Sequence, residues 1–94
     1  MEEKAKNIVK ECCDKFGLDD VTMLNSKHKT KPIRNLMGVI VYILHKDYGF
    51  SIKYVRLALN CSTTTVKRKY SRFKFLIECD KEIRELYHSL KKEE

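Results

Sequence analysis

The chain has 94 residues, of which 43% are hydrophobic and 35% are charged, and its formal net charge is +7. This length suits one domain, 1–94, with a single core, and the apolar fraction argues against global disorder. No window of about 18 apolar residues occurs, and the charged N-terminus lacks the apolar core of a signal peptide. We therefore expect a cytoplasmic protein with no membrane segment.

The positive charge is concentrated in the middle of the chain. Residues 1–25 hold four Lys and six acidic residues, and residues 75–94 hold three Lys, one Arg and six acidic residues, so each end has a net charge of −2. Residues 26–74 hold twelve Lys or Arg and a single acidic residue, a net charge of +11. A solubilising surface would intersperse both signs, whereas a segment of one sign repels itself unless it meets a polyanion. The distribution favours a polyanionic partner.

The four cysteines and three histidines do not indicate a site for metal or catalysis. Cys12 and Cys13 are adjacent, and neither C-x-x-C nor H-x-x-x-H spacing occurs. We expect free thiols that pack as small hydrophobic side chains. No His neighbours a Cys or Ser at motif spacing, and no G-x-x-x-x-G-K-[ST] phosphate loop occurs. We expect no enzymatic activity, no metal and no cofactor.

The first half of the chain predicts two long helices joined through a basic loop. Apolar residues recur at helical spacing over 2–16, and Gly17 follows as a stop. Residues 18–26 predict a short helical turn, and 26–31 a basic loop. The run VIVYIL, 39–44, has strand propensity, but the apolar pattern begins earlier, at Ile33. Residues 32–47 therefore predict a central, buried helix with Gly49 as its cap.

The second half predicts two helices separated by a tight turn, followed by a last helix. Ser51 is expected to cap a short helix over 52–59, with Asn60 in the left-handed conformation that ends helices. A longer helix starts at Ser62 or Thr63, and residues 78–94 predict a terminal amphipathic helix. The fold class is thus all-α, with five to six helices and a central helix-turn-helix.

The start of the second helix combines hydroxyl and cationic side chains. In a helix-turn-helix this end enters the DNA major groove. Hydroxyls can cap the first turn, or bond phosphates and base edges, while cations meet the flanking backbones. The apolar stripe expected to face the core is Val66, Tyr70, Phe73 and Ile77. The candidate DNA contacts on this helix are Ser62, Thr63, Thr64, Thr65, Lys67, Arg68 and Arg72.

Four segments together resemble the C-terminal duplex-binding domain of the bacterial replication initiator DnaA, which has a Trp-repressor-like helix-turn-helix. They are KHKTKPIR (27–34), VIVYIL (39–44), SIKYVRLALN (51–60) and STTTVKRKY (62–70). The resemblance implies that the recognition helix reads the major groove of double-stranded DNA while the basic loop reaches the adjacent minor groove. The loop residues are Lys27, Lys29, Lys31 and Arg34. It also implies a nucleoid-associated role in replication initiation or its regulation.

The chain departs from that family in its recognition signature. Ser62 and Thr63 stand where the family has Asp-His, and the basic loop uses Lys where the family favours Arg. The alternative function is an adaptor of the same fold that binds a protein, such as an initiator or another acidic partner. An adaptor needs an exposed apolar patch, whereas a duplex reader needs cations converging from the loop and the recognition helix.

Overall fold

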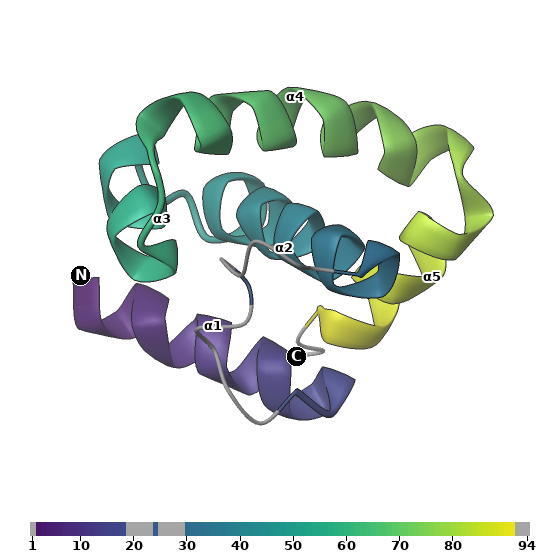
Figure 1. Ribbon diagram of the computed structural model, residues 1–94, viewed down its shortest axis with the longest axis horizontal. Helices are drawn as coiled ribbons and strands as arrows, with labels where there is room; N and C mark the ends of the chain where they lie inside the picture. Colours follow the sequence, from purple (N-terminus) through teal and green to yellow (C-terminus); the bar gives the residue numbers. More distant parts are fainter. Residues whose placement is uncertain (1, 19–23, 25–29, 92–94) are drawn as a thin grey trace.

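In the computed structural model, residues 2–18, 24 and 30–91 are described, and Figure 1 shows the helices that they form. The described residues contain five α-helices, one π-helical segment and no strand, which confirms the predicted all-α class. The elements are α1 (Glu2–Phe16), α2 (Lys31–Tyr42), η2 (Ile43–Asp47), α3 (Ile52–Leu59), α4 (Thr63–Cys79) and α5 (Lys81–Leu90).

The helix ends lie close to their predicted positions because the expected stop residues take left-handed backbone conformations. Gly17 has φ 91° and follows α1, where the amide of Leu18 donates to the carbonyl of Cys13 at 2.8 Å. This is the Schellman arrangement that closes a helix. Gly49, with φ 74°, follows η2, and Asn60, with φ 53°, ends α3. Of the short helical turn predicted at 18–26, only Leu18 and Leu24 are described, and both are buried.

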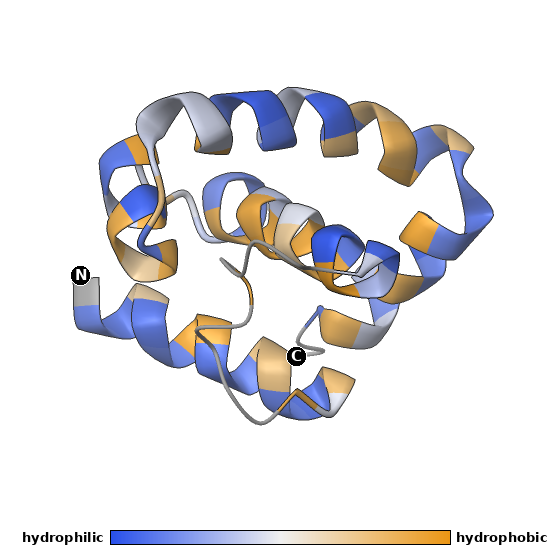
Figure 2. Ribbon diagram, viewed as in Figure 1, coloured by the Kyte–Doolittle hydropathy of each residue, from blue (hydrophilic) through white to orange (hydrophobic). Residues whose placement is uncertain are grey.

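The predicted central helix is present, but its second part winds differently. Lys31–Tyr42 is α-helical with Pro32 in its first turn, and residues 36–41 are all buried. Over Ile43–Asp47 the winding widens to a π-helix, in which the amide of Tyr48 donates to the carbonyl of Ile43 at 3.1 Å. In Figure 1, α2 lies between α1 and α4. Burial of residues 36–41 explains the apolar run in the second half of α2, whereas its first turn is hydrophilic in Figure 2.

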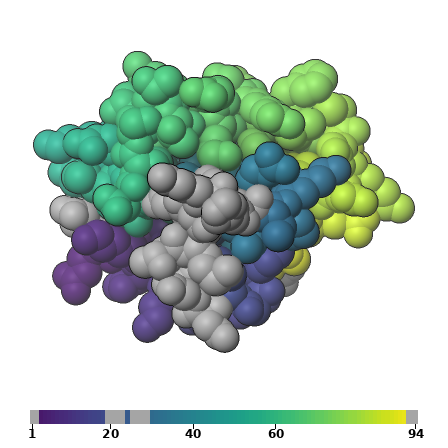
Figure 3. Space-filling view, in the orientation of Figure 1, coloured from purple at the N-terminus to yellow at the C-terminus, as the bar shows by residue number. Residues whose placement is uncertain are grey.

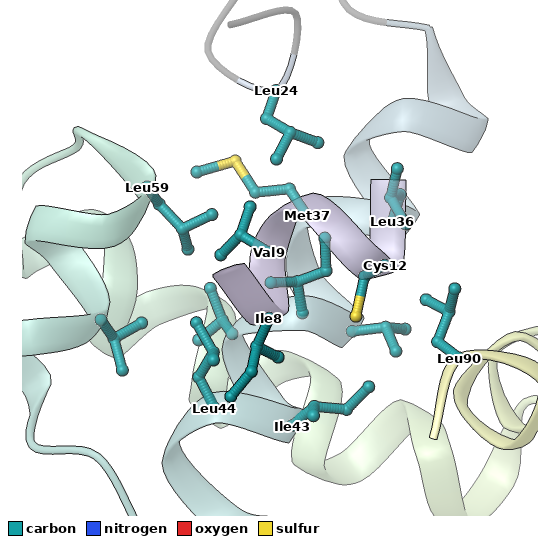
Figure 4. Packing of buried hydrophobic residues seen from close by; sticks show 14 of the residues in the cluster. Ile8, Val9, Cys12, Leu24, Leu36, Met37, Ile43, Leu44, Leu59 and Leu90 are labelled. Carbon is teal, nitrogen blue, oxygen red and sulfur yellow. The ribbon is translucent and has the colours of Figure 1, made fainter. Parts of the chain in front are cut away.

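The core joins side chains from all five α-helices. Figure 4 shows Val9 of α1 and Met37 of α2 in this cluster, with Leu59 of α3 and Leu90 of α5 at its sides. Cys12 and Cys13 are buried here, and burial raises the pKa of each thiol to about 11. Both cysteines therefore pack as neutral apolar side chains, as predicted.

The prediction of a terminal helix beginning at residue 78 is wrong. Glu78 and Cys79 complete α4, and α5 begins at Lys81. Asp80 separates the two helices because its carboxylate caps the second one, accepting from the amides of Glu82 at 2.9 Å and Ile83 at 3.3 Å. Among the described helices, none is both long and apolar enough to cross a membrane.

Candidate nucleic-acid interface

A three-residue turn, 60–62, joins α3 to α4. The left-handed Asn60 reverses the chain, and the amide of Cys61 donates to the carbonyl of Arg56 at 3.1 Å. Ser62 then caps α4: its hydroxyl accepts from the amide of Thr65 at 3.1 Å and lies 2.9 Å from the Thr65 hydroxyl. The predicted arrangement of a short helix, a tight turn and a longer helix is therefore present (Figure 1).

The core fixes which face of α4 points outward. Val66, Phe73 and Ile77 of the predicted stripe are buried, and Tyr70 is partly buried. Residues three and four positions apart share a helix face, so the opposite side is presented to solvent. That side forms an open surface, called here the outer face of α4, lined by Thr64, Lys67, Arg68, Ser71 and Arg72. In Figure 2 the middle of α4 is accordingly hydrophilic.

A cavity of about 280 Å³, called here the α2–α4 cavity, lies between the start of α2 and the flank of α4. From α2 it is lined by Lys31, Arg34 and Asn35, which share one helix face. From α4 it is lined by Thr65, Arg68, Lys69, Arg72 and Phe73. Cations separated by more than thirty residues in sequence thus line one cavity, and Figure 3 shows the start of α2 against α4 on the molecular surface.

Gly38 allows α2 and α4 to lie this close together. A β-carbon added at Gly38 would overlap the ring of Phe73. Phe73 is buried and also lines the cavity, so the contact between Gly38 and Phe73 sets the separation of the two cationic segments. Sequence reasoning assigned no role to Gly38. Gly38 could have been noticed because it interrupts an otherwise apolar helical pattern. A glycine at such a position indicates close packing.

Within the part of the chain that the structure describes, four of the cations on this surface have no acidic partner. Among the described residues, Lys31, Arg34, Arg68 and Arg72 form no ion pair, and the first turns of α2 and α4 hold no acidic residue. The one acidic residue of 26–74, Asp47, accepts a hydrogen bond from the Tyr87 hydroxyl at 2.8 Å. The cations therefore remain available to an external anion.

The nine predicted site residues that the structure describes fall into three groups. Five line the α2–α4 cavity: Lys31, Arg34, Thr65, Arg68 and Arg72. Thr64 and Lys67 lie on the outer face of α4, which shares Arg68 and Arg72 with the cavity. Ser62 and Thr63 are exposed at the tip of α4, where Ser62 is the cap. Lys27 and Lys29 lie outside the described residues. Asn35 and Ser71 were not predicted, although each is one helical turn from a predicted residue.

The tyrosines lie mostly on the other flank of α4, where they join three elements. Tyr42 of α2 stacks on Tyr70 of α4 with ring centroids 5.8 Å apart and meets Tyr87 of α5 edge-on at 5.4 Å. Burial and the hydrogen bond to Asp47 raise the pKa of Tyr87. The Tyr87 hydroxyl is thus bonded within the protein. The cluster packs α4 against α2 and α5.

The histidines and cysteines of the described residues were the remaining candidates for a metal centre. His45 approaches the carbonyl of Phe50 through Nδ1 at 2.8 Å and packs edge-on against Tyr70. In the described part of the chain, no group of three His, Cys, Asp or Glu side chains could hold a metal ion. Comparison of the chain with protein-family models, curated proteins and solved structures found no match.

Proposed function

We propose that the protein binds double-stranded DNA, with the start of α4 in the major groove and the start of α2 on the flanking backbone. The observation that carries this proposal is that Lys31 and Arg34 line one cavity with Arg68 and Arg72. Two helices contribute to one cationic surface, and a duplex presents a continuous line of phosphates to such a surface.

The exposed side chains of α4 suit a groove-reading helix. The major groove is about 12 Å wide and admits one α-helix. Thr63 and Thr64 are small and exposed at the tip of α4, so the backbone can approach base edges closely. A threonine hydroxyl can bond a base edge, and its methyl can touch the thymine methyl. Ser62 and Thr65 bond each other and hold the first turn in place.

The cations then position the helix on the duplex. Lys67, Arg68 and Arg72 are exposed along α4, where they can bond phosphates on either side of the groove. Lys31 and Arg34 extend this contact from α2, and Lys27 and Lys29 precede them in the chain. The resemblance to the DnaA duplex-binding domain supports placing this basic segment at the adjacent minor groove. It also supports a nucleoid-associated role in replication initiation or its regulation.

Fluorescence anisotropy with a labelled duplex at several salt concentrations tests the proposal. If about six phosphates are neutralised, affinity should fall roughly 1,000-fold between ~50 and ~200 mM salt. Arg34→Gln and Arg68→Gln should each weaken binding and reduce the salt dependence, whereas Lys74→Gln is a matched control. Lys74 is exposed on α4 but lines neither the cavity nor the outer face. Equal losses in all three variants would indicate non-specific attraction and count against the proposed surface.

The alternative function, a protein-binding adaptor, would require an exposed apolar patch. Among the described residues, the large hydrophobic side chains that are exposed are Phe75, at 66%, and Tyr48, at 37%. Single exposed apolar residues are ordinary on soluble proteins and do not form a docking patch. Selection from a random duplex pool at two salt concentrations separates the functions. A sequence-specific reader enriches a motif, a non-specific clamp gives salt-sensitive retention without one, and an adaptor retains no duplex.

A further inference from the structure

The α2–α4 cavity is concave, and binding of a DNA duplex does not require a concave site. A DNA backbone is a continuous rod that can lie across exposed cations, whereas the cavity is a hollow of about 280 Å³. Small-molecule sites are concave and begin at roughly 300 Å³, so this volume suits a compact ligand. The buried ring of Phe73 forms part of its lining, together with polar side chains from two helices.

The side chains around the cavity define the chemistry of that ligand. Arg34, Arg68 and Arg72 are guanidinium groups, which bind phosphate oxygens through paired hydrogen bonds. Lys31 and Lys69 add a fourth and a fifth charge. Asn35 is partly buried and supplies an amide that forms no hydrogen bond with the described residues. Among the described residues that line the cavity, none is acidic. Five cationic groups around a small volume match an anion with more than one phosphoryl group.

We propose that the α2–α4 cavity binds a free short polyphosphate, of the class of inorganic pyrophosphate or the phosphate tail of a nucleotide, and that this anion competes with duplex DNA. Competition follows because Arg68 and Arg72 line both the cavity and the outer face of α4. When they turn toward an anion in the cavity, the outer face loses two of its three cations. The competition rests on the proposed function, whereas binding of the anion does not.

Calorimetric titration of the protein with sodium pyrophosphate, at constant ionic strength and without DNA, tests the site. The wild-type protein should bind pyrophosphate saturably. Arg34→Gln, which changes the cavity but not the outer face, should weaken binding roughly tenfold, because a paired hydrogen bond to phosphate is lost. Lys74→Gln, the matched loss of one charge outside the cavity, should change affinity less than about twofold. Circular dichroism checks that both variants remain folded.

The proposal is overturned if pyrophosphate does not bind, or if Arg34→Gln and Lys74→Gln weaken binding equally, as for a diffuse charge effect. If the cavity accepts only the phosphates of a DNA backbone, pyrophosphate does not bind. In a second titration, pyrophosphate should displace a bound duplex at concentrations where chloride of equal ionic strength does not. If pyrophosphate binds through Arg34 without displacing duplex, the competition is wrong. If the protein binds no duplex, the proposed function fails, while the pyrophosphate titration still decides the site.

Discussion

The ring of Phe73 in α4 lies directly against the backbone of Gly38 in α2, leaving no room for a β-carbon at residue 38. Overpacking by Gly38→Ala should cost about 1–3 kcal/mol. The better helix propensity of alanine offsets about 1 kcal/mol of this, so the free energy of unfolding should fall by up to about 2 kcal/mol. Urea denaturation followed by circular dichroism measures the change.

A double-mutant cycle with Phe73→Leu isolates the contact between residues 38 and 73. The smaller leucine should relieve part of the overlap, so the two substitutions together should cost less than the sum of their separate effects. Strictly additive losses would mean that the Gly38 effect arises elsewhere.

The cap of α4 should contribute more to stability than the cap of α3. Ser62 accepts from the Thr65 amide at 3.1 Å and also bonds the Thr65 hydroxyl, whereas Ser51 accepts from the Tyr54 amide at 3.4 Å. We expect Ser62→Ala to cost about 1–2 kcal/mol and Ser51→Ala about 0.5 kcal/mol or less. Thermal unfolding of both variants gives the comparison, and a larger loss at Ser51 would show that these hydrogen-bond geometries do not govern the caps.

The hydrogen bond from Tyr87 to Asp47 should stabilise the packing of α5 against η2. Removing the hydroxyl by Tyr87→Phe deletes a bond to a charged acceptor, and we expect a loss of about 1–2 kcal/mol near pH 7. Tyr54→Phe is the control, because the Tyr54 hydroxyl forms no hydrogen bond with the described residues. It should change stability by less than about 0.5 kcal/mol. Urea denaturation of the two variants measures the difference.

The pKa of Tyr87 is raised in the folded protein, first by burial and then by the bond to Asp47. The folded state therefore favours the protonated phenol, whereas an unfolded tyrosine loses its proton near pH 10. This contribution is fully present below about pH 10 and is lost as the pH rises beyond it. Wild type should consequently lose stability above about pH 10 more steeply than Tyr87→Phe. If the stability of wild type and of Tyr87→Phe falls equally above about pH 10, ionisation of Tyr87 does not cause the loss.

Thr64 and the neighbouring cations should affect DNA binding in different ways. Replacing Lys67 and Arg68 by Ala removes phosphate contacts, so affinity should fall by a similar factor for all duplexes. Thr64→Ala should instead change the preference between sequences, by about 1–3 kcal/mol at the affected base pair, because a base-edge contact is lost. Random-pool selection with each variant measures both effects. A sequence-independent loss from both changes would exclude Thr64 as a base reader.

Local sequence signals located the helices because the residues that end them act locally. Gly17, Gly49 and Asn60 stop helices through their own backbone conformations, and Ser51 and Ser62 cap the helices that follow. The break at Asp80 was predicted two residues early, at residue 78, because apolar residues continue at helical spacing across it. The π-helical winding of η2 depends on packing against other elements and has no local signature.

The candidate site was only partly predictable, for the same reason. The charge distribution identified Lys31, Arg34, Arg68 and Arg72 as candidates, but the cavity that they line depends on how closely α2 approaches α4. That distance is set by Gly38 and Phe73, which lie thirty-five positions apart in the sequence. Asn35 was missed because a single polar residue beside an arginine carries no chemical signature until a second helix faces it.

Mapping amide chemical-shift changes by nuclear magnetic resonance, during titration with a duplex, tests the central claim most directly. If α2 and α4 form one DNA-binding surface, residues 31–35 and 62–72 should shift together, with the same concentration dependence, while exposed residues of α1 and α5 remain unchanged. Shifts confined to α4, or centred on α1 or α5, would contradict a surface built from both cationic segments.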